Sequence, residues 1–316
     1  MEQATYLVPL KAHDLAALDE LTEYFFSLPQ LEVLVIDASP PEIYAEHSRR
    51  WLGRLTHLPV DPAIRGLNGK TRGVLSGLRY AAHEKIIIAD DDVRYTADSL
   101  SRVIAALDRA DVVRPQNFFY PQAWHTILDG GRILLNRLTG GDWPGTLGVR
   151  RSALANGYDP DVLFENLELV RTVVARGGRH LLLDDVYVPR RPPQSSHFWS
   201  QRVRQAYDEF ARPGRMIAQL LIAPALVWCS LKSRWSSAAL CACAVVVLAE
   251  AGRRRRGGRK YFPALASLAA PLWLLERALC SWLALASRLR YGGVRYSDNV
   301  IRSAATPPIK LKRIAA

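Results

Sequence analysis

The stretch Ile86-Ile-Ile-Ala-Asp-Asp-Asp-Val-Arg-Tyr95 decides the fold of this chain. Its first four residues form a continuous apolar run, which is typical of a strand buried on both faces of a sheet. Apolar strands and amphipathic helices alternate around this stretch, and this alternation predicts an α/β protein with a mainly parallel sheet and some antiparallel additions. Because ligands bind beyond the carboxyl ends of such strands, we expect the functional site at Asp90–Asp92.

The elements expected around this stretch lie in the first two hundred residues. Strands are predicted at residues 6–10, 31–36, 58–60, 86–89, 112–115 and 180–183. Helices are predicted at residues 14–26, 42–54, 97–107, 133–138 and 165–176, with one more following Asn68-Gly-Lys70. The pattern changes near Arg212-Pro-Gly-Arg215, so we expect a catalytic domain over residues 1–212 and a membrane-associated region over residues 213–316.

Composition narrows the class of protein. The chain has 316 residues, 49% of them hydrophobic and 23% charged, which excludes a disordered chain and a mostly buried channel or carrier. The net charge is +12, and the basic residues cluster beside apolar segments, where anionic lipid explains them better than nucleic acid does. All 4 cysteines lie inside apolar runs, so neither a disulfide framework nor a zinc site is expected. The first residues do not resemble a signal for export.

Three apolar segments follow residue 215, at residues 216–231, 235–249 and 261–286. The first two are predicted to form a membrane hairpin, although each is shorter than the roughly 20 residues of a typical span. The third contains Glu276-Arg277, so we expect it to lie in the membrane interface or to re-enter. The basic block Arg253–Arg256 predicts a cell-membrane protein whose catalytic domain faces the cytoplasm. The alternative is the helical core of a soluble domain.

The aspartate run carries the clearest chemistry. Asp90 and Asp92 stand two residues apart at a strand end, so their carboxylates can point to the same side and hold one Mg²⁺ or Mn²⁺ ion. A metal there would neutralise a departing diphosphate. The alternative is an acidic turn that caps the helix starting near Ala97.

The sequence here resembles the family 2-type glycosyltransferases with the GT-A fold, and within them most closely the ceramide glucosyltransferase-like branch. The resemblance covers nearly the whole chain and includes the aspartate run itself, which is similar to the D-x-D strand end of that family. The other similar segments, in order, are Glu32-Val-Leu-Val-Ile-Asp-Ala-Ser39, Asn68-Gly-Lys-Thr-Arg-Gly-Val-Leu-Ser-Gly77, Glu165-Asn-Leu-Glu168, Phe198-Trp-Ser-Gln-Arg-Val-Arg-Gln205 and Arg212-Pro-Gly214.

The resemblance implies a nucleotide-sugar donor, a divalent metal and a lipid or lipid-linked acceptor. It implies that Asp37 contacts the ribose or base, that Asp90 and Asp92 contact the metal, and that Lys70 approaches phosphate or is simply solvated. Arg204 would stabilise the diphosphate, because a guanidinium matches phosphate oxygens in a fork. The remaining donor-binding candidates are Asn68, Asp91 and Gln201.

The general base is where the chain departs from the family. The family usually has an aspartate second in its E-D motif, and this chain has Asn166, which cannot accept a proton. Glu165 is then the first candidate for the base of an inverting transfer, with Glu168 the fallback and Asp142 a candidate from elsewhere. Two alternatives follow: a polysaccharide synthase of the same fold, against which Gln205 argues, or a non-catalytic nucleotide-sugar-binding or scaffold relative.

Overall fold

The structure is a computed structural model that describes residues 3–297 and 299–315, with side chains described as far as residue 311. The chain forms two compact units, each assembled from separate segments. The sheet unit comprises Met1–Pro115, Trp143–Val188 and Thr306–Ala316, and the helical unit comprises Gln116–Asp142 and Pro189–Ala305. The change in sequence pattern at residue 212 coincides with the start of a long apolar helix at Pro213.

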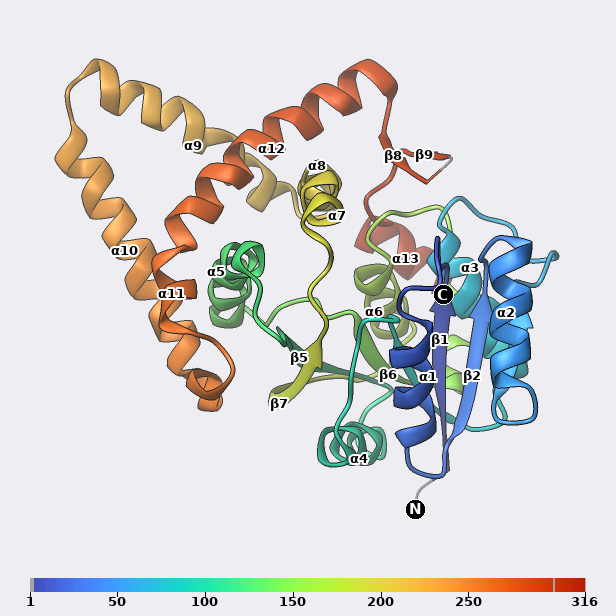
Figure 1. The fold of residues 1–316 in the computed structure, drawn as a ribbon. Helices are drawn as coiled ribbons and strands as arrows, with labels where there is room; N and C mark the ends of the chain where they lie inside the picture. Colours follow the sequence, from blue (N-terminus) through green and yellow to red (C-terminus); the bar gives the residue numbers. More distant parts are fainter. Residues whose placement is uncertain (1–2, 298, 316) are drawn as a thin grey trace. The chain divides into compact units, whose positions relative to one another are not determined.

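The sheet unit carries strands and helices in alternation (Figure 1). Its strands are β1 (Ala4–Leu10), β2 (Glu32–Asp37), β3 (Thr56–Pro59), β4 (Lys85–Ala89), β5 (Val112–Phe119), β6 (Thr146–Arg150) and β7 (His180–Arg190), of which β5 and β7 continue into the helical unit. Its helices are α1 (Leu18–Ser27), α2 (Pro41–Trp51), α3 (Gly69–Tyr80), α4 (Ala97–Ala106), α6 (Glu165–Ala175) and α13 (Pro308–Ala315).

The strands form one seven-stranded sheet in the order β3-β2-β1-β4-β6-β5-β7. Strands β3, β2, β1 and β4 are parallel neighbours, whereas β6 runs antiparallel to both β4 and β5. Strand β4 pairs on one side with Ala4 to Leu7 of β1 and on the other side with Thr146 to Arg150 of β6. The predicted fold class, a mainly parallel sheet with antiparallel additions, is confirmed.

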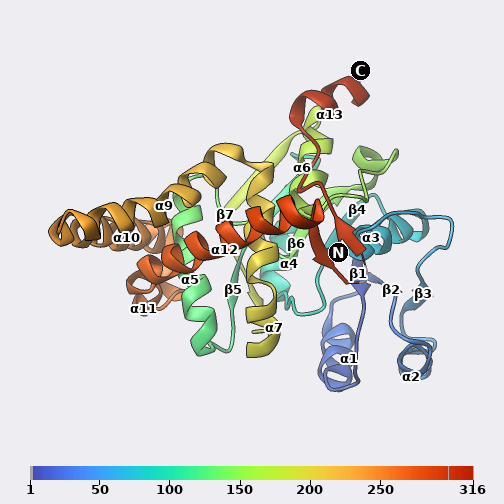
Figure 2. The ribbon, with the colours of Figure 1, turned by 90° about the horizontal axis from the view of Figure 1, so that it is seen from above.

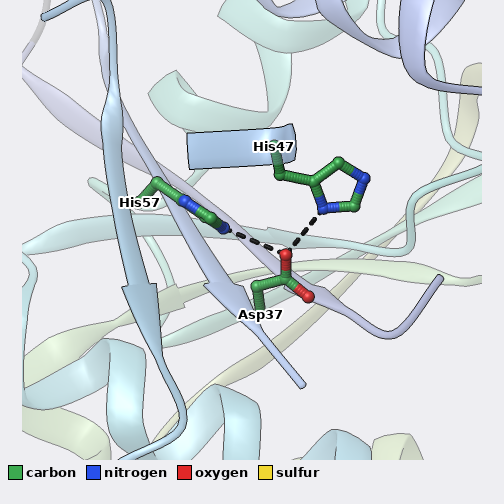
Figure 3. A group of neighbouring side chains, drawn as sticks. All are labelled: Asp37, His47 and His57. Carbon is green, nitrogen blue, oxygen red and sulfur yellow. Dashed lines mark hydrogen bonds and ion pairs between the residues drawn. The ribbon is translucent and has the colours of Figure 1, made fainter. Parts of the chain in front are cut away.

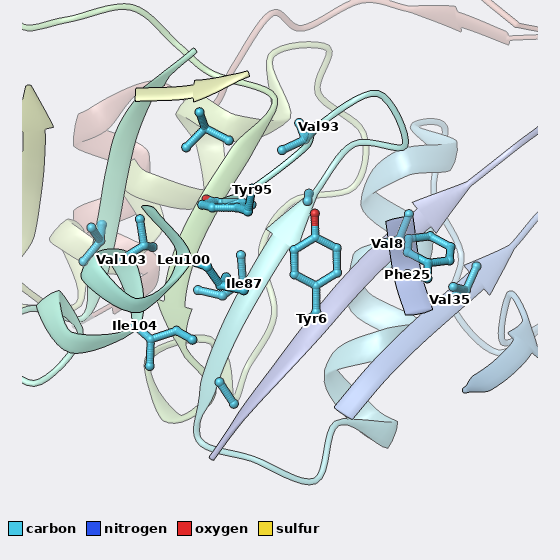
Figure 4. Packing of buried hydrophobic residues seen from close by; sticks show 14 of the residues in the cluster. Tyr6, Val8, Phe25, Val35, Ile87, Val93, Tyr95, Leu100, Val103 and Ile104 are labelled. Atoms are coloured by element: carbon cyan, nitrogen blue, oxygen red, sulfur yellow. The ribbon is translucent and has the colours of Figure 1, made fainter. Parts of the chain in front are cut away.

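Helices cover both faces of this sheet, because its strands are apolar on both sides. One buried cluster joins the sheet to α1, α2 and α4 and includes Tyr6, Phe25, Ile87 and Leu100 (Figure 4). The other joins it to α3 and α6 and includes Leu7, Ile88 and Val173. With both faces covered, the exposed polar ends of the strands are where a ligand can bind.

Helix α3 lies unusually close to β1. A Cβ atom added at Gly77 would lie 2.2 Å from Cδ1 of Leu7, and one added at Gly73 would lie 2.9 Å from Cβ of Pro9. The glycines therefore cost helix propensity but allow the helix to pack directly on the strand. The close packing at Gly73 and Gly77 holds α3 on β1, with the first residue of the helix near the carboxyl ends of the parallel strands.

Strand β6 was not expected from the sequence. It has only five residues with Gly148 in its middle, which weakens the strand pattern. In the structure a Cβ added at Gly148 would lie 3.0 Å from Cγ1 of Val103, so α4 packs where a side chain would be. The glycine that obscures the strand in the sequence is thus required by its packing.

The helical unit contains α5 (Trp124–Leu138), α7 (Ser195–Ser200), α8 (Arg202–Tyr207), α9 (Pro213–Leu231), α10 (Trp235–Arg254), α11 (Ala264–Leu268) and α12 (Ala270–Tyr291), followed by the hairpin β8 (Val294–Tyr296) and β9 (Asn299–Ile301). Helix α12 packs against α5, α8 and α9. The view from above in Figure 2 shows α12 beside α5 and α9. Helix α5 begins at Trp124, well before the predicted residue 133, and Gly130-Gly131, which have low helix propensity, lie inside it. A Cβ atom added at Gly131 would lie 2.7 Å from Cα of Ala270, so the glycine allows α12 to pack closely against α5.

The charges inside the third apolar segment have partners in the same unit. Arg202 of α8 is 2% exposed and donates to Glu276 of α12 at 2.7 Å and to Asp129 of α5 at 3.0 Å. Arg132 also pairs with Asp129, at 2.8 Å, and with Asp142. Glu276, which interrupts the apolar pattern, therefore links α12 to α8 through Arg202, and Arg202 in turn links to α5 through Asp129.

Two helices of this unit have the length and composition to cross a membrane: α9, and the helical segment Trp235–Lys260 that contains α10. Their large apolar side chains are mostly exposed; Leu221 of α9 is 59% exposed and Leu240 of α10 is 72% exposed. This is consistent with a membrane-associated region.

Candidate functional site

The carboxyl end of β4 brings three of the predicted site residues together. Nζ of Lys70 lies 2.6 Å from Oδ1 of Asp90 and 2.8 Å from Oε1 of Glu165. Lys70 lies in the first turn of α3, Asp90 directly follows β4, and Glu165 is the first residue of α6. Lys70 and Glu165 are 95 positions apart in the sequence. Asp91 is exposed, while Asp90 and Asp92 are half-buried beside it.

Lys70 stays charged in this arrangement. Burial by itself would lower the pKa of Lys70, but Asp90 and Glu165 outweigh burial and raise that pKa well above its usual range. A charged ammonium group therefore lies between two carboxylates at the end of the strand in this structure. A group of this kind can neutralise phosphate oxygens or hold a carboxylate in position.

Asn68 fixes the start of α3. Its Oδ1 accepts the N–H of Thr71 at 3.2 Å, as an N-cap does, and its Nδ2 donates to the carbonyl of Val162 at 2.9 Å. The side chain is fully buried. Asn68 thus ties the helix that carries Lys70 to the loop that leads into Glu165.

Asn166 has a structural function that an aspartate could not perform. Its Nδ2 donates to the carbonyl of Pro144 at 2.9 Å, and the next carbonyl, that of Gly145, accepts the N–H of Asp90 at 2.8 Å. A carboxylate in place of the amide would face the carbonyl as a second acceptor. The amide at residue 166 therefore supports the loop that holds Asp90.

Glu168, the fallback base, lies one helical turn further along α6 and is fully buried. Its Oε2 accepts the N–H of Thr306 at 2.7 Å, which comes from the C-terminal segment. Burial raises the pKa of Glu168, and the hydrogen bonds from Thr306 only partly oppose this. The structure thus places Glu165 beside Lys70 and Glu168 beneath the C-terminal segment.

Asp37 lies at the end of β2 in a buried cluster with two histidines (Figure 3). Its Oδ2 accepts hydrogen bonds from Nδ1 of His47 at 2.7 Å and from Nε2 of His57 at 3.0 Å. Its Oδ1 accepts the N–H of Ser39 at 2.8 Å. Burial would raise the pKa of Asp37, but the bonds from His57, His47 and Ser39 outweigh it and lower the pKa to about 2.

The three side chains of this cluster could in principle hold a metal, since their nearest ligand atoms lie within 4.8 Å of one another. Around a tetrahedral ion with bonds of about 2.1 Å, however, neighbouring ligand atoms are about 3.4 Å apart. The two nitrogens lie 2.7 and 3.0 Å from the shared oxygen, which are hydrogen-bond distances. We therefore describe Asp37, His47 and His57 as a hydrogen-bonded cluster.

Sequence reasoning missed both histidines. His47 is on α2 and His57 is on β3, and neither has a partner at metal-ligand or catalytic spacing. They meet only because β3 pairs with β2, with His57 opposite Val35, two residues before Asp37.

Arg204 and Gln201 belong to the helical unit. The guanidinium of Arg204 donates to the side-chain oxygen of Gln201 and lies 5.0 Å from the centre of the Tyr296 ring. Asp142, the base candidate from elsewhere, pairs with Arg132 and accepts from Nδ2 of Asn136 at 2.8 Å. Its carboxylate is therefore engaged within the helical unit.

The residues at the end of β4 fit a hard divalent cation. Asp90 and Asp92 supply carboxylate oxygens, the donors that Mg²⁺ and Mn²⁺ prefer, and both side chains are partly accessible. The mainly parallel sheet, with strands β3, β2, β1 and β4 parallel and β6 antiparallel beside β4, matches the GT-A fold.

The fold was compared with those of solved structures. A mannosyltransferase from Pyrobaculum calidifontis, in complex with GDP-Man and Mn²⁺, matches with a TM-score of 0.52 and 18% identity over 88% of this chain and 86% of its own. The glucosyl-3-phosphoglycerate synthase of Mycobacterium tuberculosis matches with a TM-score of 0.46 and 12% identity, covering 62% of this chain and 74% of its own. No protein-family model and no curated protein sequence matches. The first match confirms the predicted GT-A fold.

Proposed function

We propose that this protein is a membrane-associated, metal-dependent glycosyltransferase. It would transfer a sugar, with inversion, from a nucleotide-sugar donor to a lipid or lipid-linked acceptor. Within the family 2-type enzymes it would belong to the ceramide glucosyltransferase-like branch, a proposal that rests on the resemblance of its sequence motifs. The observation that carries the proposal is the linked group of Asp90, Lys70 and Glu165 at the carboxyl end of β4. The mannosyltransferase of the same fold, whose structure holds GDP-Man and Mn²⁺, supports a nucleotide sugar and a metal.

In this proposal each member of the group has one task. Asp90 and Asp92 would hold Mg²⁺ or Mn²⁺, which when bound supplies positive charge to the diphosphate leaving group. Lys70 keeps its charge and would turn from Asp90 toward the phosphate oxygens of the donor. Glu165, released from that ion pair, would accept the proton of the acceptor hydroxyl.

The other donor contacts remain part of the proposal. Asp91 is exposed beside the metal-binding carboxylates and would face the sugar-phosphate end of the donor. Asp37 would contact the nucleoside from the end of β2, and Asn68 would act by holding α3. Gln201 remains a proposed donor-binding residue, and Arg204 is proposed to stabilise the diphosphate.

A lipid acceptor is supported by an apolar groove in the helical unit. It has a volume of about 520 Å³ and is lined by Ala223, Pro224, Val227, Trp228 and Leu231 of α9 and by Trp282 of α12. Such a surface suits an acyl or isoprenoid chain, because burying apolar area removes it from water. The basic residues around Arg253 support a location in the cell membrane with the catalytic unit facing the cytoplasm.

Donor binding to the detergent-solubilised protein tests the proposal. We expect one nucleoside diphosphate to raise the apparent melting temperature with Mn²⁺ present and to have no effect in EDTA. Asp92→Asn should abolish that stabilisation. A protein that no nucleotide stabilises would instead fit a scaffold role.

Transfer assays then identify the base. Glu165→Gln should lower turnover by about 10²–10⁴-fold, the usual contribution of a general base, and leave donor binding intact. Glu168→Gln is the matched variant one turn along the same helix. Loss of turnover in Glu168→Gln alone would move the base to Glu168, and normal turnover in both would exclude both.

A further inference from the structure

A cavity of about 310 Å³ lies in the sheet unit at the end of α6 that is opposite to Glu165. Its wall combines the C-terminal half of α6, the loop at residues 156–160 and the C-terminal segment; the lining residues are Asn156, Tyr158, Asp159, Pro160, Thr172, Ala175, Arg176, Thr306, Lys310 and Leu311. Helix α6 has 11 residues, so this end of the helix is about 15 Å from Glu165. The α6 side of the cavity is therefore remote from Glu165, whereas its loop side reaches α3, because Pro160 accepts the N–H of Asn68 at 2.9 Å.

Two buried hydrogen-bond donors that belong to residues of the cavity wall lack an acceptor in the described part of the chain. Thr172 is 4% exposed and lines the cavity, yet among the described residues its Oγ1 has no hydrogen-bond partner. Threonines inside helices commonly donate to the carbonyl one turn earlier, so this is unusual. Nη1 of Arg176 is also buried and without a partner in the described part of the chain. Lys310 adds an exposed ammonium group from α13.

The acidic side chains beside the cavity are already engaged. Oδ2 of Asp159 accepts the hydroxyl of Thr306 at 3.0 Å, and its Oδ1 accepts the N–H of Asp161 at 2.9 Å. Glu168, one turn before Thr172, accepts the N–H of Thr306 and has a raised pKa because it is buried. The lining residues therefore include two cations, Arg176 and Lys310, and one carboxylate, Asp159, whose oxygens already accept hydrogen bonds. The cavity has more hydrogen-bond donors than acceptors.

We propose that this cavity binds a phosphate group, either free or carried by a small soluble metabolite. A guanidinium, an ammonium group and a buried hydroxyl offer several donors to the oxygens of one phosphate. The volume lies at the lower end of the range of small-molecule sites, roughly 300–1,000 Å³, which leaves room for a sugar-sized group. The bound phosphate would join α6, which begins with Glu165, to the C-terminal segment through Lys310.

Calorimetric titration of the full-length protein in detergent with EDTA tests the site, using inorganic phosphate and glucose 6-phosphate as probes. Thr172→Val keeps the shape and removes only the hydroxyl, so it should weaken phosphate binding about tenfold. Because no hydrogen bond is lost, the same variant should keep or raise the melting temperature. Arg176→Gln should weaken binding at least as much. Tighter binding of glucose 6-phosphate than of phosphate would indicate a metabolite, and equal binding would indicate the free ion.

Two control variants make the result decisive. Arg179→Gln removes the same charge three residues further on, from an exposed position outside the cavity, and should bind phosphate normally. Asp92→Asn should also bind normally, which separates this site from the proposed donor site. Equal binding by Thr172→Val, Arg176→Gln and the wild type would overturn the proposal. So would an equal loss in Arg179→Gln, because that would indicate only general charge attraction.

Discussion

The pKa of Asp37 is set by its burial and by the hydrogen bonds that its carboxylate accepts. Its side chain is enclosed, with Oδ2 shared between two imidazoles and Oδ1 bonded to a backbone N–H. His47 stacks on Trp51 with ring centres 4.7 Å apart, and His57 stacks on Tyr44 at 4.4 Å. The cluster therefore joins the end of β2 to α2 and β3.

Folding stability should reflect this ionisation in acid. Because the folded pKa of Asp37 is about 2, below its usual 3.8, the carboxylate stabilises the fold above about pH 4 and this contribution is lost as the pH falls through 2. The shift corresponds to about 2 kcal/mol. We expect the difference in free energy of unfolding between wild type and Asp37→Asn to become progressively smaller as the pH falls from 4 to 2. Chemical unfolding at a series of pH values measures this, and a difference that does not change with pH would contradict it.

The packing of α10 on α5 depends on a close approach at one position. A Cβ atom added at Gly252 would lie 2.0 Å from the carbonyl oxygen of Leu134, and the obstructing atom is backbone. Side-chain rotation cannot relieve such an overlap, so one helix must move. This approach also allows Arg137 of α5 to donate to the carbonyl of Gly252 at 3.0 Å.

We expect Gly252→Ala to destabilise the protein by about 1–3 kcal/mol or more, the cost of overpacking a close contact. The measurement is the apparent melting temperature in detergent. Gly214→Ala is the matched control, because Gly214 is also helical and a Cβ there meets nothing within 4 Å. That variant should be neutral or slightly stabilising, since alanine is the better helix former. Equal melting temperatures for Gly252→Ala and wild type would show that α10 does not pack this closely.

The whole molecule combines a covered sheet with helices whose apolar side chains are exposed. In α9, Leu221 and Val227 are 59% and 58% exposed, on a helix of the composition and length of a membrane span. Water would not favour such a surface. Contact with lipid is therefore the environment that we expect for the helical unit.

Membrane fractionation at high salt and at alkaline pH tests this. Wild type should stay with the membrane, because burial of apolar area does not depend on salt. The double variant Leu221→Arg/Val227→Arg should be released in part, since each arginine costs up to about 2.5–3.5 kcal/mol at the centre of a bilayer. Leu52→Arg is the control, because Leu52 is 84% exposed but belongs to the sheet unit. Release of the wild type by salt alone would show that charge, and not apolar burial, attaches the protein.

The sequence by itself determined most of the sheet and predicted the carboxyl end of β4 as the candidate site. A continuous apolar strand that runs into aspartates can only be a buried strand with its polar end at the sheet edge, and β4 is that strand. Local periodicity was sufficient there because the strand is short, strongly apolar and followed by charges. The same local reasoning missed β6 and the start of α5, where glycines that weaken the pattern are required by close packing.

Only the tertiary structure decided which side chains meet. Lys70, Asp90 and Glu165 are far apart in sequence, and nothing local indicates that one ammonium group bridges the two carboxylates. The histidines of Asp37 and the donors around Thr172 also come from separate elements. Strand and helix patterns depend on neighbours along the chain, whereas hydrogen bonds and ion pairs depend on distances in space, which the chain sets only when it folds.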